Sequence, residues 1–352
     1  IPFETLSKAF RHALIAPVRT NKLGYGNPRG AYSLRHAIVE MLNMERGLNV
    51  ELDNICIARG SQMGIFLAAR VLAKPNKYVV VESLSYPPAR EAFRSCGAEI
   101  LTVGLDQHGI KVDELEALCK QYPIVAIYVT PHHQFPTTVM MAAERRLKLL
   151  LLAEQYDFMI VEDDYDHEFH FHHHPVFPLA STNHAERVIY VGSLSKVLAP
   201  GLRVGYLVAS KDIINRCASE VMLIDRQGNS VTELAVAELM QTGEIKRHIR
   251  RTLKTYNERR NILIALLQNE LSEFINFDPP NGGLAIWLRM NDGVDIDKFV
   301  QQAILEKVTV LPGSLFSEKL TRVSAIRLGF GSHNVSELNL GIQRLKRAFK
   351  SS

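Results

Sequence analysis

Short apolar stretches rich in valine and isoleucine recur along the first two-thirds of the chain and predict β-strands. Between them lie segments whose apolar residues recur every three or four positions, which predicts amphipathic helices. The predicted strands are residues 55–58, 78–82, 99–103, 125–129, 158–162, 188–191 and 204–208. The predicted helices are residues 33–43, 61–72, 88–96, 113–121 and 142–156. Such alternation is typical of an α/β sheet with helices on both faces.

The last third of the chain has a different pattern. A long polar and basic stretch at about residues 244–270 predicts a single helix. Two short strands and two helices are predicted after it, at residues 284–288, 324–328, 295–306 and 336–350. We therefore expect three parts: an N-terminal arm (residues 1–30), a large domain (31–245), and a long linking helix with a smaller α+β domain (246–352).

Composition narrows the class of protein. The 352 residues are 47% hydrophobic and 22% charged, which excludes a disordered or fibrous chain. No uninterrupted apolar run approaches the ~20 residues of a membrane span, and a net charge of +4 does not indicate nucleic-acid binding by bulk electrostatics. The four cysteines form no CxxC pair, so we expect reduced thiols and a cytoplasmic location. The chain starts at Ile1 without a visible secretory signal, and we expect further residues upstream.

The segment from Ser193 to Gly205 carries the most specific chemistry. It places Lys196 in a loop of small residues between two predicted strands. We expect this lysine to be buried, because a desolvated ammonium loses its proton more easily and its amine can then attack a carbonyl. Ser193, Ser195 and Arg203 flank it, and hydroxyls with a guanidinium suit a phosphate. Together they predict an aldehyde-phosphate cofactor held as a Schiff base, whereas the lysine alone is more typical of a basic surface turn.

An acidic run follows the predicted strand at residues 158–162. Glu162, Asp163 and Asp164 stand at the carboxyl end of that strand, where ligands of open α/β sheets bind. A buried carboxylate there can keep a pyridine nitrogen protonated and so make the ring an electron sink. The phenol of Tyr165 is placed to bond a ring hydroxyl. By itself, however, such a run more often binds a metal or is simply solvated.

A third motif, Arg59-Gly60-Ser61-Gln62, ends one predicted strand and opens the next helix. Free N–H groups and the positive end of the helix dipole make such a turn a phosphate site. The motif is neither GxGxxG nor a Walker A loop, so dinucleotide and P-loop interpretations lose support. An ordinary helix N-cap at Ser61 is the alternative.

Taken together, these motifs resemble the fold-type-I aminotransferases that depend on pyridoxal phosphate. More narrowly, they resemble the aminotransferase-like domain of the MocR subfamily of GntR-type transcriptional regulators. The resemblance covers nearly the whole chain and implies a mainly parallel seven-stranded sheet plus a smaller α+β domain, pyridoxal 5'-phosphate as cofactor, and a homodimer. The matching motifs are residues 25–30, 34–35, 59–62, 82–86, 130–137, 161–166, 193–205 and 326–330.

The resemblance also implies a role for each matching residue. Lys196 forms the Schiff base with the cofactor, Asp163 pairs with the pyridine nitrogen, and Tyr165 bonds the ring hydroxyl. Tyr86 stacks on the ring, and Arg327 receives the carboxylate of an amino compound. The cofactor phosphate is bound by Gly60, Ser61, Gln62, Ser193, Ser195 and Arg203, together with Tyr25 of the partner subunit in the dimer.

One departure from the family pattern bears on function. Where ordinary family members have Asn-Pro-Thr-Gly, this chain has Phe135-Pro136-Thr137-Thr138, and the asparagine that assists the ring hydroxyl and the substrate carboxylate is absent. The stretch His133–Pro136 instead resembles the regulators. We therefore expect an effector-sensing domain in which an amino compound replaces Lys196 on the cofactor, with DNA bound only through an upstream winged-helix domain. The alternative is a free-standing aminotransferase acting on an amino acid.

We assign no metal ligand from the sequence. The run from His167 to His174 contains five histidines, and His170 and His172 would share one face of a strand. No cysteine or second compact ligand set accompanies them, so we expect a polar loop or sheet edge.

Overall fold

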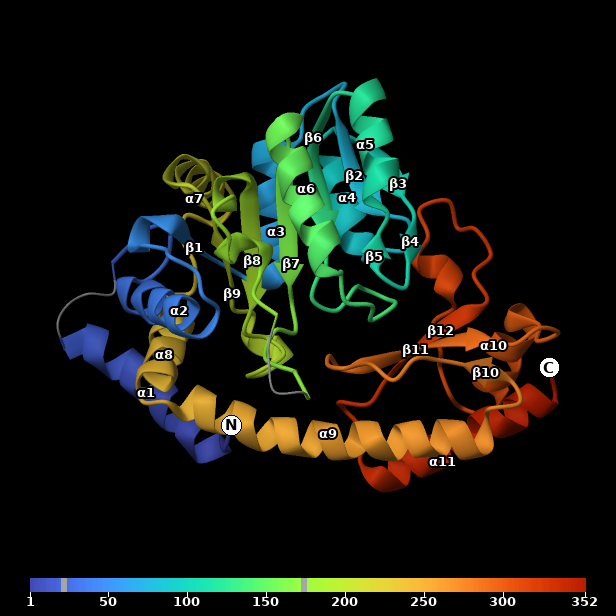
Figure 1. The fold of residues 1–352 in the computed structure, drawn as a ribbon. Helices are drawn as coiled ribbons and strands as arrows, with labels where there is room; N and C mark the ends of the chain where they lie inside the picture. Colours follow the sequence, from blue (N-terminus) through green and yellow to red (C-terminus); the bar gives the residue numbers. More distant parts are fainter. Residues whose placement is uncertain (20–23, 172–175) are drawn as a thin grey trace.

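A computed structural model describes residues 1–19, 24–171 and 176–352 (Figure 1). Its main sheet has the strand order β1-β9-β8-β7-β6-β2-β3. All neighbouring strands are parallel except at β9, which runs antiparallel to both β8 and β1. The predicted seven-stranded, mainly parallel sheet is confirmed. The strands are β1 (Ile55–Ala58), β2 (Tyr78–Glu82), β3 (Glu99–Val103), β6 (Ile124–Val129), β7 (Met159–Asp164), β8 (Val188–Ser193) and β9 (Gly205–Val208).

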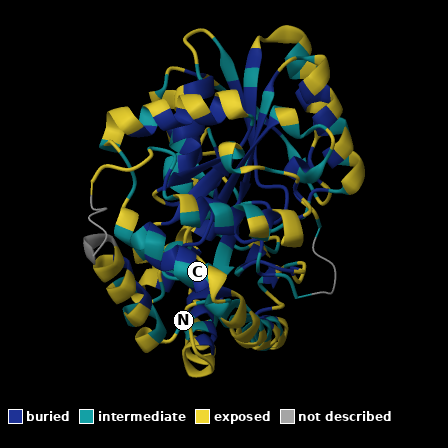
Figure 2. Ribbon diagram, turned by 90° about the vertical axis from the view of Figure 1, so that its left-hand side faces the viewer, coloured by how far each residue is buried: buried dark blue, intermediate teal, exposed yellow. Residues whose placement is uncertain are grey.

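Helices cover both faces of this sheet, and their outer sides are exposed while the strands between them are buried (Figure 2). Strands buried on both faces are apolar throughout rather than alternating, which explains why the sequence pattern locates them to within two residues. Two short antiparallel strands, β4 (Leu105–Asp106) and β5 (Gly109–Ile110), form a small hairpin. The helices are α2 (Tyr32–Glu45), α3 (Gly60–Leu72), α4 (Pro87–Ser95), α5 (Val112–Gln121), α6 (Ala143–Gln155), α7 (Lys211–Asp225) and α8 (Ser230–Gln241).

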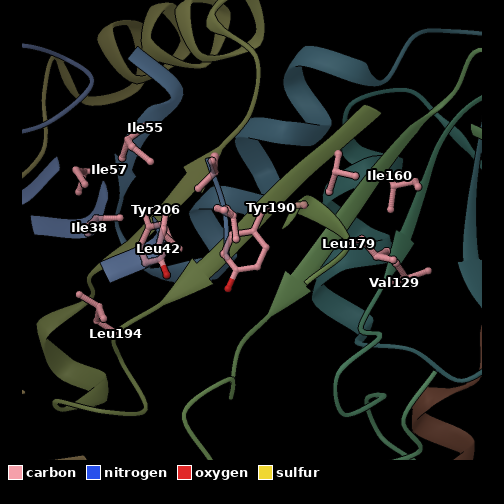
Figure 3. Close-up of a cluster of buried hydrophobic side chains, with 14 of the residues drawn as sticks. Ile38, Leu42, Ile55, Ile57, Val129, Ile160, Leu179, Tyr190, Leu194 and Tyr206 are labelled. Atoms are coloured by element: carbon pink, nitrogen blue, oxygen red, sulfur yellow. The ribbon is translucent and has the colours of Figure 1, made fainter. Parts of the chain in front are cut away.

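Side-chain alternation divides the apolar residues of the sheet between two cores. Along β2, for example, Val80 faces one core while Val79 and Val81 face the other. Figure 3 shows part of the first core, in which the rings of Tyr190 and Tyr206 lie among aliphatic side chains from α2 and the central strands. The sheet is therefore held from both sides by apolar packing.

A smaller antiparallel sheet follows, with the order β10 (Ile275–Asn276), β11 (Ala285–Met290) and β12 (Ala325–Gly329). It shares a third apolar core with α10 (Ile296–Leu305) and α11 (Val335–Lys350). The long helix α9 (Glu244–Glu270) runs beneath both sheets (Figure 1). Its Leu253 packs on the first core and its Leu263 belongs to the third, so this helix joins the two parts.

The N-terminal segment, which we expected to be an arm, contains helix α1 (Phe3–Arg19). Ala9 and Ala13 on this helix are buried in the first core, and His12 lies 3.0 Å from Glu238 of α8. All four cysteines are free. Within the described ranges, no helix is both long and apolar enough to cross a membrane.

Gly192 offers a test of the central packing. A Cβ added at this position in β8 would overlap the ring of Tyr206 on the neighbouring strand. We expect Gly192→Ala to lower the free energy of unfolding by about 1–3 kcal/mol, the usual cost of overpacking. Chemical denaturation measures the change. Gly201→Ala is the matched control, because a Cβ there would meet no described atom within 4 Å; equal stability of the two variants would contradict this packing.

Candidate active site

A cavity of about 540 Å³ lies where the main sheet meets the small sheet. Strands β2, β6, β7 and β8 are parallel, so their carboxyl ends lie at the same edge of the sheet, which is where ligands bind in open α/β folds. The small sheet contributes to the opposite wall through β12. Six residues predicted from the sequence line this cavity: Ser61, Tyr86, Asp163, Tyr165, Lys196 and Arg327.

Strand alternation aims Asp163 at the cavity. Its neighbours on β7 point to the other face, where Glu162 accepts hydrogen bonds from the N–H groups of Leu179 and Ala180. Asp163 Oδ2 accepts a hydrogen bond of 2.7 Å from the Tyr128 hydroxyl. Its Oδ1 is buried and has no partner among the described residues. Burial raises the pKa of Asp163 to about 7, so a cationic partner at Oδ1 would stabilise the ionised carboxylate.

Lys196 lies in a turn after β8 and is exposed to the cavity, so the expectation that it is buried is wrong. The reason is the packing of the turn. Leu194 and Val197 occupy the inward positions and are buried in the first core. Lys196, which stands between them in the sequence, projects into the cavity, where its amine can reach a ligand.

Two of the predicted phosphate ligands, Gly60 and Arg203, meet at the first turn of α3. Gly60 begins this helix with a φ of +78°, and a Cβ there would lie 2.7 Å from the Arg203 guanidinium. That guanidinium donates to the Arg59 carbonyl at 3.1 Å. Ser195 Oγ is buried without a partner in the described ranges, and the Ser195 N–H donates to Ser193 Oγ. The helix dipole and the Arg203 guanidinium therefore meet at this turn, and both favour an anion.

Two details of this turn differ from simple sequence expectations. The N-cap of α3 is Arg59, so Ser61 is not the cap but the second residue of the helix. The side-chain amide of Gln62 donates to the Pro88 carbonyl at 3.2 Å, which ties α3 to α4. The group that Gln62 offers to an anion is thus its backbone N–H at the helix start rather than its amide nitrogen.

Phe135 occupies the centre of the cavity wall. Its ring lies 5.3 Å from Tyr86 and 6.1 Å from Tyr165, measured between ring centroids, and both pairs are edge-to-face. The Arg327 guanidinium carbon lies 4.7 Å from the centre of the same ring. Phe135 also packs on Phe316 of the smaller part. It therefore holds the plane of Arg327 by stacking, in the place where the family pattern has a hydrogen-bonding asparagine.

The structure does not bring Tyr25 into this cavity. Its side chain is 80% exposed and lies over Arg226, 5.1 Å from ring centre to guanidinium carbon. Sequence reasoning also missed lining residues. Tyr128 is one of them, and three more come from α9: His248, Thr252 and Tyr256. Their spacing of four residues, which places them on one helix face, is the signal that could have found them.

Comparison with known proteins agrees with this geometry. The family described as "Aminotransferase class I and II" matches residues 3–345. This chain belongs to that family. Its members use pyridoxal phosphate, and the free Oδ1 of Asp163 together with the anion site at α3 fit the ring nitrogen and phosphate of that cofactor.

Relatives in this family divide into two kinds. An "Aromatic-amino-acid aminotransferase 1" of Thermococcus litoralis is 29% identical over 93% of this chain and 80% of its own length. An "Uncharacterized HTH-type transcriptional regulator" of Bacillus subtilis is 31% identical over 92% of this chain and 68% of its own length. Among solved structures, a Pyrococcus horikoshii kynurenine aminotransferase in complex with PMP is 31% identical with a TM-score of 0.90, covering 98% of this chain and 87% of that one.

A buried carboxyl group positions the loop that carries Phe135. Glu82 Oε2, at the end of β2, accepts hydrogen bonds from Thr130 Oγ1 at 3.2 Å and from Gln134 Nε2 at 3.0 Å. Its Oε1 has no partner in the part of the chain that the structure describes. Burial raises the pKa of Glu82 to about 7, so the folded protein holds a proton there that the unfolded chain has already released.

This difference makes stability depend on pH. Between pH 4.5 and 7 the unfolded chain releases the Glu82 proton first, so stability falls as pH rises. We expect Glu82→Gln to remove the part of that loss that Glu82 contributes and to be more stable than wild type at pH 8 by on the order of 3 kcal/mol. Urea denaturation at pH 5 and pH 8 measures it, with the exposed Glu40→Gln as control. If the free energy of unfolding changed equally with pH in wild type and in Glu82→Gln, the raised pKa of Glu82 would be contradicted.

Proposed function

We propose that this protein binds pyridoxal 5'-phosphate at Lys196 and transfers the amino group of an amino acid to an oxo acid. The observation that carries the proposal is that Lys196, Asp163 and Arg327 come from three distant segments and line one cavity. An amine, a buried carboxylate and a guanidinium are the groups that attach an aldehyde cofactor, hold its ring nitrogen protonated, and bind a substrate carboxylate.

When bound, the cofactor supplies an electron-accepting ring that stabilises negative charge at the substrate α-carbon. Asp163 keeps the proton on the ring nitrogen by accepting its hydrogen bond at Oδ1. The Tyr128 hydroxyl fixes the other oxygen of that carboxylate, so the pair has one orientation. The phenol of Tyr165, which also donates to the His133 carbonyl at 3.1 Å, is placed to bond the ring hydroxyl.

Lys196 moves the proton in this proposal. With the cofactor bound, the free Nζ of Lys196 would be the group that takes a proton at the substrate α-carbon and gives it back, as a general base and then a general acid. Its place in an exposed turn on the cavity leaves this side chain free to reach a group bound there. No other lysine lines the cavity among the described residues.

Arg327 binds the substrate carboxylate. Its Nε is buried and has no partner within the described ranges, so the guanidinium still has a donor to offer. Phe135 stacks on the guanidinium and fixes its plane for a bidentate pair. The rings of Tyr86 and Phe135 form an apolar wall that excludes water from the reacting carbon.

A homodimer is part of the proposal. Tyr25 is far more exposed than a tyrosine usually is and is held in place by Arg226. This arrangement suits a side chain that completes the phosphate site of a partner subunit. Exposed apolar residues on α7 nearby, among them Met222, Leu223 and Ile224, are consistent with a covered surface in the dimer.

A second candidate function is effector sensing within a transcriptional regulator of the MocR type. Phe135 favours it, because this residue replaces the family asparagine that assists turnover and serves instead to pack the two parts of the chain together. The relationship to an HTH-type regulator supports it as well. In this reading an amino compound takes the place of Lys196, and DNA is bound by a winged-helix domain upstream of Ile1.

Substitution of the lysine tests the cofactor assignment common to both functions. We expect Lys196→Ala to abolish the visible absorbance of the covalently attached cofactor and to lower amino transfer by at least about 10³-fold. Asp163→Asn should keep the attachment but lower transfer, because an amide does not hold the ring proton. Absorbance spectra and borohydride trapping followed by peptide mapping measure this. Lys211→Ala, on exposed α7, is the control; a wild-type spectrum from Lys196→Ala would refute the assignment.

The number of turnovers distinguishes the two functions. The protein with bound cofactor is incubated with a panel of amino acids and an excess of an oxo acid, and the new oxo acid is counted per chain. An aminotransferase should form many equivalents, because Lys196 regenerates the starting state in each cycle. One equivalent or fewer from every amino acid would reject the main proposal and leave effector sensing.

A further inference from the structure

Three histidine rings meet on the side of β7 that faces away from the cavity. His132 lies in the loop after β6, whereas His167 and His170 lie in the segment after β7. The ring of His132 lies 4.9 Å from His167 and 4.6 Å from His170, and the latter two are 5.3 Å apart, measured between ring centroids. One candidate ligand atom from each of the three lies within 4.8 Å of the others.

The rings offer free lone pairs. His132 is 2% exposed, and neither of its ring nitrogens has a hydrogen-bond partner in the described part of the chain. His170 Nε2 is likewise buried and unpartnered within residues 1–19, 24–171 and 176–352. Burial lowers the pKa of His132 to about 2 and that of His170 to about 3, so both rings are neutral. A buried polar atom without a partner is destabilising, and a bound ion would offset that cost.

Asp164 supports the third ring. Its Oδ2 accepts hydrogen bonds from His167 Nδ1 at 2.8 Å and from the Tyr190 hydroxyl at 2.7 Å. With Nδ1 donating to the carboxylate, His167 Nε2 is the atom left for a ligand. A carboxylate behind a histidine is the usual way in which proteins orient a metal-binding imidazole. Asp164 Oδ1 has no partner among the described residues and lies 3.8 Å from His132 Nδ1.

We propose that His132, His167 and His170 bind a divalent transition-metal ion, zinc being the occupant, with Asp164 orienting His167 from its Nδ1 side and with the fourth coordination position left open. Three neutral imidazoles with an open fourth position are a donor set that zinc favours. Tetrahedral zinc with Zn–N bonds of about 2.0–2.1 Å needs ligand nitrogens about 3.4 Å apart. The three rings therefore draw closer on binding, through small rotations of the His167 and His170 side chains.

The bound ion would link two loops that follow adjacent strands. The loop after β6 carries His132 and, three residues later, Phe135 of the cavity wall. The segment after β7 carries the other two ligands. Asp163 and Asp164 point to opposite faces of β7, so one serves the cavity and the other serves the histidines. The metal thus lies outside the cofactor cavity and fixes the backbone from which that wall extends.

The test is zinc binding by untagged protein carrying its cofactor. Protein dialysed against a chelator is titrated with zinc chloride by calorimetry, and we expect one ion per chain. His132→Ala and His170→Ala should each lower the affinity at least tenfold, since even outer-shell partners are worth ~10–100-fold. The exposed His108→Ala is the control and should bind as wild type does.

A second control addresses the neighbouring histidine run. His172, His173 and His174 lie outside the described residues, and replacing all three by alanine should leave the stoichiometry and affinity unchanged. Loss of binding in that variant, or unchanged binding by His132→Ala, would overturn the proposal. Zinc-edge X-ray absorption on wild type needs no mutation. We expect three imidazoles at ~2.0–2.1 Å, and a spectrum with fewer than two would also overturn it.

Discussion

The alternation of side chains along β7 is the constraint on which the chemistry of this protein depends. Because consecutive residues of a strand point to opposite faces, Asp163 faces the cavity while Glu162 and Asp164 face the other way. Each carboxylate then has its own environment: a phenol and an open position for Asp163, and histidine and tyrosine partners for Asp164. A shift of one residue in the register of this strand would exchange these roles and remove the site.

The parallel direction of the neighbouring strands has a second consequence. Because β2, β6, β7 and β8 end at one edge, the loops that follow them meet there, and residues separated by more than a hundred positions line the same cavity. The small sheet closes this edge through Arg327, and Phe135 packs against both parts. The position that distinguishes this chain from the ordinary family pattern is therefore also a packing position, which links its chemistry to its architecture.

Much of this arrangement was predictable from the sequence, and there is a physical reason why the prediction succeeded. Strands buried on both faces need continuous apolar runs, so the ranges of β1 and β2 follow from hydrophobicity alone. The turn before α3 and the segment around Lys196 were identified because few other functions need glycine, hydroxyls, lysine and arginine in that order. The order of residue types along short stretches of the chain thus determined the fold class and the chemical type of the site.

Tertiary structure alone decided which side chains meet. The exposure of Lys196 depends on Leu194 and Val197 filling the core, and the bond from Tyr128 to Asp163 depends on the pairing of β6 with β7. His132 and His170 are 38 positions apart, and no local pattern indicates that their rings are neighbours. Periodicity reports which face of its own element a residue occupies, but not which residue of another element lies opposite it, because that depends on how the strands pair and the helices pack.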